Sequence, residues 1–272
     1  MLYYCVRLSL IPLLACPDCR EDLTLDDGAV VQLQIVHAGA LMCRACKRTF
    51  PIVDGILRAM PSQLLAEQER EIKARDEQVE QYEAMWYLNL FGKVEIPMTL
   101  RRLAPTPSNR LLEAGCGTGR MTGLLRTQVR DVVSVDFSFE SLRVNAAKLA
   151  LAGADNVDLV QADLCNLPFK DAVFDRVVSC QVIEHIPGEQ ARAAAVSGLS
   201  RVAVPGARVV VSAYQHSIFT TSKQGEHDGG IPFFRFTRRE FHSLLSGHLR
   251  VDSLTGSLVY IHLAQCSKEA AS

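Results

Sequence analysis

From Arg110 onward, short apolar stretches alternate with longer segments of mixed polarity. The apolar stretches are rich in valine and leucine and lie at 111–112, 132–135, 157–160, 176–179 and 208–211. The segments 140–151 and 189–203 lie between them and have the length of helices. Strands that alternate with helices predict a parallel sheet covered on both faces, so we expect an α/β domain over 110–272. The stretches 249–254 and 258–263 are three residues apart, which predicts a hairpin and an antiparallel last strand.

Residues 1–60 follow a different pattern, with short β-branched and apolar runs around cysteines. The run 29–36 follows a turn at Asp26-Asp27-Gly28, and together they predict a small β-rich module. The run 8–15 is similar to the core of a signal peptide, but Arg7 interrupts it and no basic stretch precedes it. We therefore expect 8–15 to be a strand that enters the first pair of cysteines.

Residues 61–109 are rich in glutamine, glutamate and arginine and predict a helical connector. Their apolar residues are spaced seven apart, at Leu65, Ile72, Val79 and Trp86. The neighbouring positions on this stripe are polar, so the helix should lie on another surface rather than form a coiled coil. The helical pattern is lost by Gly92, and a Pro-rich boundary follows before residue 110.

The composition excludes several classes of protein. Of the 272 residues, 48% are hydrophobic and 22% are charged, and the formal net charge is −1. These values exclude intrinsic disorder and a strongly basic arm for nucleic acid. We find no apolar run of about 18 residues, so no membrane span is expected. The nine cysteines are odd in number and unevenly spread, which favours a reducing, cytoplasmic compartment over a disulfide-stapled secreted domain.

Two CxxC pairs are the first chemical signal: Cys16 with Cys19, and Cys43 with Cys46. Each pair places two thiolates on a tight turn, and four thiolates satisfy a tetrahedral Zn²⁺ ion in a module too small to build its own core. A redox-active CxxC would sit on a thioredoxin-like βαβ unit, and no such pattern surrounds these pairs; chance cysteines in a core are the other alternative. Four cysteine ligands leave no position for water, so we expect a structural and not a catalytic zinc.

The second signal is the glycine-rich segment 112–120, Leu-Glu-Ala-Gly-Cys-Gly-Thr-Gly-Arg, which follows a strand and precedes a helix. Glycines there let a ligand approach the backbone at the carboxyl edge of the sheet. A dinucleotide fingerprint would require glycine where Arg120 stands. Asp136 ends the next strand, where a carboxylate can accept both hydroxyls of a ribose. Asp163 ends the third strand, where it can reach an adenine amine.

Together these features resemble the class I S-adenosylmethionine-dependent methyltransferases of the type 11 family. The resemblance covers 110–265 and also rests on Leu167-Pro168-Phe169, on Phe174-Asp175 and on 199–206. It implies a Rossmann-like seven-stranded sheet, S-adenosylmethionine as methyl donor and S-adenosylhomocysteine as product. Residues 12–60 resemble the zinc-ribbon family of the tRNA-methyltransferase activator subunit, including the Phe-Pro-Ile-Val-Asp-Gly-Ile segment at 50–56. That family acts in trans on separate methyltransferases, whereas here the ribbon is fused in cis.

The methyltransferase resemblance implies roles for the residues of the donor site. Glu113 would orient the loop or the methionine amino group, and Arg120 would pair with the donor's carboxylate. Asp136 would bind the ribose and Asp163 the adenine amine, and helix N-capping is the alternative for both. The expected cofactor-binding residues are Glu113, Gly115, Cys116, Gly117, Arg120, Asp136, Phe137, Asp163, Leu164 and Gln181.

Methyl transfer needs a general base only when the acceptor is a hydroxyl or a protonated nitrogen. His185 follows the fourth strand and is one candidate, although a histidine hydrogen-bonded at a helix start fits the same pattern. His216 is a second candidate and lies in 213–236, a long connection that predicts either a substrate lid or a surface loop. Some quinone-pathway O-methyltransferases of this fold use a Glu-x-x-Glu-His metal site here, but Gln181 replaces the first glutamate.

Aromatic residues outside the sheet predict a cover for the donor site. They form two groups, Tyr82, Trp86 and Tyr87 in the connector, and Phe233, Phe234 and Phe236 in the long connection. We expect Tyr82 or Tyr87 and the stretch 213–236 to close over the donor, with His185 and His216 beneath them. Packing of the aromatic rings against the helices of the sheet is the alternative.

We interpret the chain as an S-adenosylmethionine-dependent methyltransferase with an N-terminal zinc ribbon. A small-molecule acceptor is favoured because the evenly mixed charge offers no electrostatic footprint for RNA. An RNA or translation-factor acceptor is the alternative, supported by the ribbon and by scattered arginines. A non-enzymatic alternative is a module that binds the donor without catalysis and regulates a partner. The ribbon is also a candidate surface for a protein partner.

Overall fold

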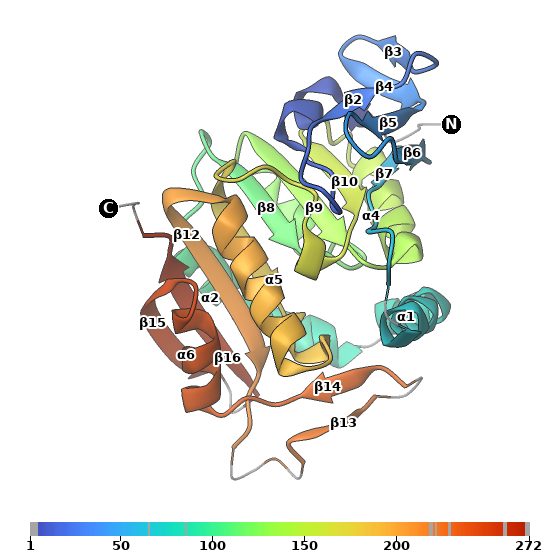
Figure 1. Ribbon diagram of the computed structural model, residues 1–272. Helices are drawn as coiled ribbons and strands as arrows, with labels where there is room; N and C mark the ends of the chain where they lie inside the picture. Colours follow the sequence, from blue (N-terminus) through green and yellow to red (C-terminus); the bar gives the residue numbers. More distant parts are fainter. Residues whose placement is uncertain are drawn as a thin grey trace.

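A central mixed sheet organises the chain (Figure 1). The computed structural model describes residues 5–64, 66–84, 86–217, 220, 222–227, 230–257 and 260–269, with the side chains of 66, 80–91 and 257 set aside. Seven strands come from the half that begins at Arg110. They are β8 (Arg110–Ala114), β9 (Asp131–Asp136), β10 (Val157–Gln161), β11 (Phe174–Cys180), β12 (Ala203–Tyr214), β15 (Arg250–Ser257) and β16 (Ile261–Ser267).

The order of these seven strands is β10-β9-β8-β11-β12-β16-β15. The first five are parallel, and β16 is antiparallel to both β12 and β15. This confirms the predicted seven-stranded α/β sheet with its antiparallel last strand. The predicted turn at 255–257 is wrong, because β15 runs on to Ser257. Gly256 lies inside the strand, where a Cβ atom would meet the Gln215 Oε1 atom at 2.7 Å, so this glycine permits a close approach rather than a turn.

The cysteine-bearing module continues the same sheet. Its strand β7 (Ile56–Arg58) pairs in parallel with β10, and β6 (Thr49–Val53), β5 (Ala40–Cys43) and β2 (Leu23–Leu25) follow antiparallel to one another. The sheet therefore has eleven strands. A second small sheet is formed by β1 (Val6–Arg7), β4 (Ile35–Ala38) and β3 (Val30–Gln32), with β1 next to β10 of the central sheet. Figure 1 shows β3 and β4 at the top of the molecule. The sequence predicted a β-rich module but not its fusion to the sheet edge.

One expectation within this module is wrong. Residues 8–15 are not a strand, because Leu8–Leu13 forms a 3₁₀ helix, η1, whose Leu10 and Leu13 are buried. Pro12 has no N–H to give to a strand ladder, which favours the helical turn. The run 29–36 contains β3 and the start of β4, which form a hairpin around Leu33 and Gln34. Both residues have left-handed φ values, +50° and +65°, and neither is a residue that normally signals such a turn.

Six α-helices lie among the described residues. They are α1 (Ala66–Ala84), α2 (Trp86–Leu103), α3 (Thr122–Leu125), α4 (Phe139–Leu151), α5 (Glu189–Val202) and α6 (Arg238–Ser246). The predicted helical connector is confirmed, but its expected end before Gly92 is wrong, since α2 continues through Gly92 and Pro97. Packing of α2 against β11, β12 and β16 outweighs the low helix propensity of these two residues.

The two faces of the sheet carry separate apolar cores. One core contains Leu199 of α5 and Phe241 of α6 together with Leu10 of η1, so the cysteine module shares it with the larger domain. The opposite core contains Leu103 of α2, Leu125 of α3 and Leu142 of α4. Figure 1 shows α5 in front of the sheet and α2 behind it. No helix among the described residues is long and apolar enough to cross a membrane.

Candidate functional site

The glycine-rich loop after β8 takes a shape that other residues could not adopt. Gly115 has φ +84°, and a Cβ atom there would lie 2.1 Å from a methyl group of Val182. Gly119 has φ +87°, and its Cβ atom would lie 2.1 Å from the Asn145 side-chain oxygen. The backbone N–H groups of Gly115 and Cys116 both donate to the Val135 carbonyl oxygen, which ties the loop to β9. The loop therefore presents its backbone at the carboxyl ends of β8 and β9.

Asp136 is buried at the end of β9 and holds the loop from the other side. Its Oδ2 atom accepts the Gly117 N–H at 2.7 Å, and its Oδ1 atom accepts the Ser138 N–H at 2.9 Å. Burial raises the pKa of this carboxyl, and the two backbone N–H groups oppose the rise. The predicted N-cap role belongs to Ser138, whose hydroxyl accepts the Ser141 N–H at the start of α4.

Asp163 lies at the end of β10 and caps the short 3₁₀ helix η2 (Leu164–Asn166), as the alternative reading expected. Its Oδ1 atom accepts the Cys165 N–H at 2.9 Å. Its Oδ2 atom accepts the side-chain amides of Asn166 at 3.0 Å and of Gln68, from α1, at 3.2 Å. Capping of η2 does not exclude contact between Asp163 and a ligand, because Asp163 also borders a cavity.

One cavity lies at the carboxyl ends of β8, β9, β10 and β11. All ten residues expected from the sequence to bind the cofactor line it, namely Glu113, Gly115, Cys116, Gly117, Arg120, Asp136, Phe137, Asp163, Leu164 and Gln181. Their role in binding stays a prediction, but the fold brings them to one place. Glu113 accepts the hydroxyls of Thr122 at 2.6 Å and of Ser134 at 2.8 Å, and burial raises its pKa to about 7. These two bonds tie β8 to β9 and to the start of α3, and the role of Glu113 in orienting the loop stays a prediction.

Helix α1 forms a wall of the cavity that the sequence analysis did not assign. Gln68, Glu71, Arg75 and Gln78 line the cavity and are spaced three, four and three residues apart, so they share one face of the helix. The Asp76 Oδ1 atom accepts the Ser138 hydroxyl and the Glu140 N–H at the start of α4. The polar positions beside the apolar stripe predicted a helix that lies on another surface, but not that this face of the helix borders the cavity.

Glu95, on α2, is a second residue that the sequence analysis missed. Its side chain is 3% exposed, and its carboxylate accepts the Gln181 amide at 2.5 Å and the Ser212 hydroxyl at 3.0 Å. The guanidinium of Arg120 lies 3.5 Å from the same carboxylate. No sequence signal pointed to Glu95, because the helix was expected to have ended before it.

The two candidate bases lie outside the walls of this cavity. His185 is buried in the 3₁₀ helix η3 (Ile183–His185), and its Nδ1 atom donates to the Pro232 carbonyl oxygen at 2.9 Å. Burial, with Arg75 and His227 nearby, lowers the pKa of His185 to about 3, so the ring is neutral at physiological pH. This geometry favours the alternative of a hydrogen-bonded histidine at a helix start. The neighbouring Ile186 is the residue that reaches the cavity.

His216 has its own local contacts. Its backbone N–H donates to the Phe236 carbonyl oxygen at 2.7 Å, and its Nδ1 atom lies 2.9 Å from the Thr220 hydroxyl. The stretch 213–236 contains a short hairpin of β13 (Gln224–Glu226) and β14 (Pro232–Phe234), and its Ile231 borders the cavity. The side chains of Tyr82, Trp86 and Tyr87 lie outside the described residues, so their expected place over the donor is not seen.

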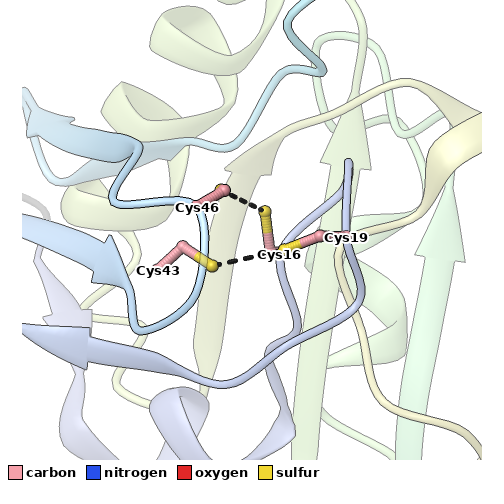
Figure 2. A group of neighbouring side chains, drawn as sticks. All are labelled: Cys16, Cys19, Cys43 and Cys46. Atoms are coloured by element: carbon pink, nitrogen blue, oxygen red, sulfur yellow. Dashed lines mark hydrogen bonds between the residues drawn. The ribbon is translucent and has the colours of Figure 1, made fainter.

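The four paired cysteines converge on a single point. Figure 2 shows their sulfur atoms turned toward one another from the turn before β2 and the turn after β5. The Sγ atoms of Cys16 and Cys46 are 3.7 Å apart, those of Cys19 and Cys43 are 3.4 Å apart, and all four lie within 4.8 Å of one another. A tetrahedral zinc ion with Zn–S bonds of about 2.3 Å separates its sulfurs by about 3.8 Å, so the four thiols fit this ion.

Within the described part of the chain, this is the one group of cysteine, histidine and carboxylate side chains placed to hold a metal. The Glu-x-x-Glu-His site considered for 181–185 therefore gains no support. Gln181 instead donates its amide to Glu95.

Two family models match the chain. Residues 112–211 match the methyltransferase domain, and residues 7–55 match the Trm112p-like protein. The fold, the cavity and the four cysteines agree with these matches. The chain therefore joins a class I S-adenosylmethionine-dependent methyltransferase domain to a Trm112p-like domain with a zinc-ribbon cysteine set.

Curated relatives match over the methyltransferase domain. A demethylmenaquinone methyltransferase of Clavibacter sepedonicus is 36% identical over 117 residues, which are 42% of this chain and 44% of the relative. A probable tRNA methyltransferase 9B of Bos taurus is 30% identical over 105 residues, which are 39% of this chain and 21% of the relative. The chain thus spans less than half the length of these relatives.

Solved structures share the fold. The DhpI–SAH complex has a TM-score of 0.60 and 20% identity, covering 77% of this chain and 100% of that one. A chain from the complex between the Haloferax volcanii Trm112 methyltransferase activator and a methyltransferase has a TM-score of 0.60 and 15% identity, covering 74% of this chain and 97% of that one. At these identities the likeness concerns the fold.

Proposed function

We propose that the protein transfers a methyl group from S-adenosylmethionine to an acceptor. The observation that carries the proposal is the convergence of ten residues, predicted from the sequence as donor ligands, on one cavity. They come from the ends of four adjacent strands, the edge at which open α/β sheets bind ligands. In this proposal residues 1–60 are a zinc ribbon, 61–109 a helical connector and 110–272 the catalytic domain.

Each part of the donor has a matching group in the cavity. The Asp136 carboxylate is held by two backbone N–H groups, and its oxygens can also accept the two ribose hydroxyls. The Asp163 Oδ2 atom accepts the Gln68 amide, and the adenine amine would take the place of that amide. Arg120 would meet the carboxylate of the methionine chain. The protein's own contribution to the chemistry is alignment of the methyl group with the acceptor and exclusion of water.

Replacing Asp136 with alanine should weaken binding of S-adenosylmethionine by about 1.5–3 kcal/mol, because charge-assisted hydrogen bonds to two ribose hydroxyls are lost. Titration calorimetry with S-adenosylmethionine and S-adenosylhomocysteine measures the change. Asp155→Ala removes an equal charge from an exposed position and should leave both affinities unchanged. An Asp136→Ala protein with wild-type affinity would remove Asp136 from the donor site.

A small molecule is the proposed acceptor. Helix α1 lies over the cavity and is hydrogen-bonded to both Asp163 and the start of α4, which narrows the approach. A small molecule passes such an opening more easily than a folded RNA. The even charge of the chain is consistent with this, since RNA-binding surfaces are usually basic. The Trm112p-like domain, and the tRNA named in one relative, are the observations that favour RNA.

Incubation with methyl-labelled donor and separate metabolite, RNA and protein fractions tests the acceptor. We expect the label in the metabolite fraction. Label in RNA or protein would overturn the small-molecule proposal while keeping the methyltransferase. Donor binding without transfer to any fraction would favour the non-catalytic, regulatory alternative.

His185 keeps its proposed role as base only if turnover depends on it. Because its Nδ1–H donates to Pro232, the Nε2 atom carries the lone pair that a base needs. A base at this position would make His185→Ala slow turnover by about 10²–10⁴-fold with little change in donor affinity. Because the ring lies outside the cavity walls, we expect turnover to stay close to that of the wild type. His216→Ala, examined in the same way, reports on the second candidate. Turnover that survives in the His185 variant would leave this histidine a structural role between η3 and β14.

A further inference from the structure

The face of α2 that packs behind the donor cavity carries three residues one helical turn apart, Gly92, Glu95 and Thr99. A Cβ atom at Gly92 would lie 3.5 Å from a guanidinium nitrogen of Arg120, so the helix backbone packs on that side chain. The Thr99 hydroxyl lies 3.9 Å from the Cys180 sulfur. Arg120 and Cys180 both line the cavity. This face of α2 therefore supports the cavity wall from outside.

Glu95 is the charged member of this face and connects three separate segments. One carboxylate oxygen accepts the Ser212 hydroxyl from β12, and the other accepts the Gln181 amide after β11. That second oxygen also faces Arg120 of the glycine loop. A carboxylate this deeply buried needs such partners, because an unpaired buried charge is strongly destabilising.

The side chain of Gln181 depends on this arrangement. Gln181 has a left-handed φ of +57°, which costs a non-glycine residue free energy. Its backbone N–H donates to the Ser212 carbonyl oxygen at 3.1 Å, while its amide donates to Glu95. Glu95 and Ser212 thus hold Gln181 at both its backbone and its side chain, at the point where β11 opens into the cavity.

We propose that Glu95 is a positioning residue of the donor site, which holds Arg120 and Gln181 in place and balances the charge of Arg120 so that the site accepts a sulfonium. The inference rests on the proposed methyltransferase function. S-Adenosylmethionine carries one positive charge more than S-adenosylhomocysteine, because its sulfur is a sulfonium. Without the negative charge of Glu95, the Arg120 guanidinium would repel the donor more than the product. Glu95 therefore sets the preference of the site for donor over product.

The test is the ratio of the dissociation constants of S-adenosylhomocysteine and S-adenosylmethionine, measured by calorimetry on the full-length chain. The isosteric Glu95→Gln variant should lower this ratio by about tenfold, because it removes a negative charge beside Arg120. The two ligands have the same methionine carboxylate, so loss of a shared contact cancels in the ratio. Asp252→Asn removes a charge from the edge strand β15, outside the lining of the cavity, and should leave the ratio unchanged.

A second variant keeps the proposal testable if Glu95→Gln does not fold. Arg120→Met leaves the Glu95 charge unbalanced and should move the ratio in the opposite direction, toward the donor. In the double variant the two changes should cancel, and the ratio should return to near the wild-type value.

Equal weakening of both ligands by Glu95→Gln, or an unchanged ratio in Arg120→Met, would overturn the role of Glu95. Failure of the proposed methyltransferase function would give a different result, because the wild-type protein would then bind neither S-adenosylmethionine nor S-adenosylhomocysteine.

Discussion

Replacing Arg7 with methionine is expected to lower the free energy of unfolding by about 3–5 kcal/mol. Arg7 lies on β1 of the Trm112p-like domain, and its guanidinium contacts Asp158 of β10 at 2.7 Å and Asp131 of β9 at 2.8 Å. The Arg7 N–H also donates to Asp158 at 2.9 Å. The Asp158 side chain is 1% exposed, so the variant would leave a buried carboxylate without its countercharge.

The pH dependence of the lost free energy of unfolding is a second way to test the Arg7→Met prediction. Burial raises the pKa of Asp158, and Arg7 opposes the rise, so removing Arg7 should raise this pKa further in the folded state. A carboxyl whose pKa is higher in the folded than in the unfolded protein destabilises the fold only where it is ionised. It costs no stability at a pH at which it is protonated in both the folded and the unfolded protein. The difference between the variant and the wild type should therefore be full at neutral pH and shrink as the pH falls toward about 4.

Arg143→Met is the matched control for this prediction. Arg143 also joins the two domains, through Asp54 at 3.2 Å, but both side chains are about half exposed. An exposed ion pair contributes about 1 kcal/mol or less, so this variant should unfold close to the wild type. Denaturant unfolding of the three proteins measures the differences. Equal stability of the Arg7 and Arg143 variants would contradict a buried electrostatic link between the domains.

The loop and the acidic strand ends could be predicted from the sequence because local chemistry determines them. Gly115 and Gly119 adopt left-handed φ values in contact with neighbouring side chains, and only glycine fits there. Asp136 and Asp163 end strands whose valine-rich pattern is plain in the sequence. Parallel strands end at a common edge, so the meeting of these residues follows from the strand assignment.

The remaining features depend on contacts between distant segments. Strand β7 is three residues long and has no pattern of its own that selects β10 as its partner. Helix α2 passes Gly92 and Pro97 because its buried face packs on the sheet, which overrides local propensity. Glu95 was missed for the same reason. The polar face of α1 indicated a helix that lies on another surface, but only the fold places that face over the cavity.

Removal of zinc is expected to have the largest effect of all. In zinc-finger peptides, structural zinc contributes about 10–16 kcal/mol of apparent binding free energy, which is also folding free energy. Here the four cysteines flank β2, β5 and β6, and these strands extend the sheet beyond β7. Loss of the ion should therefore unfold β2, β5 and β6 and expose the edge of β7, a template for aggregation.

The purified, reduced protein should contain one zinc ion per chain, and Cys43→Ser should lower both the metal content and the melting temperature. Cys165→Ser is the matched control, because Cys165 is a thiol outside the cluster whose Sγ atom contacts the Ala191 carbonyl oxygen. It should keep its zinc.

Elemental analysis and thermal unfolding in the presence of a strong chelator measure both effects. The closed set of four thiolates leaves no open coordination position, so the metal should act on stability and not on the chemical step. Wild-type protein that folds fully and contains no zinc would show that the cluster is not a metal site.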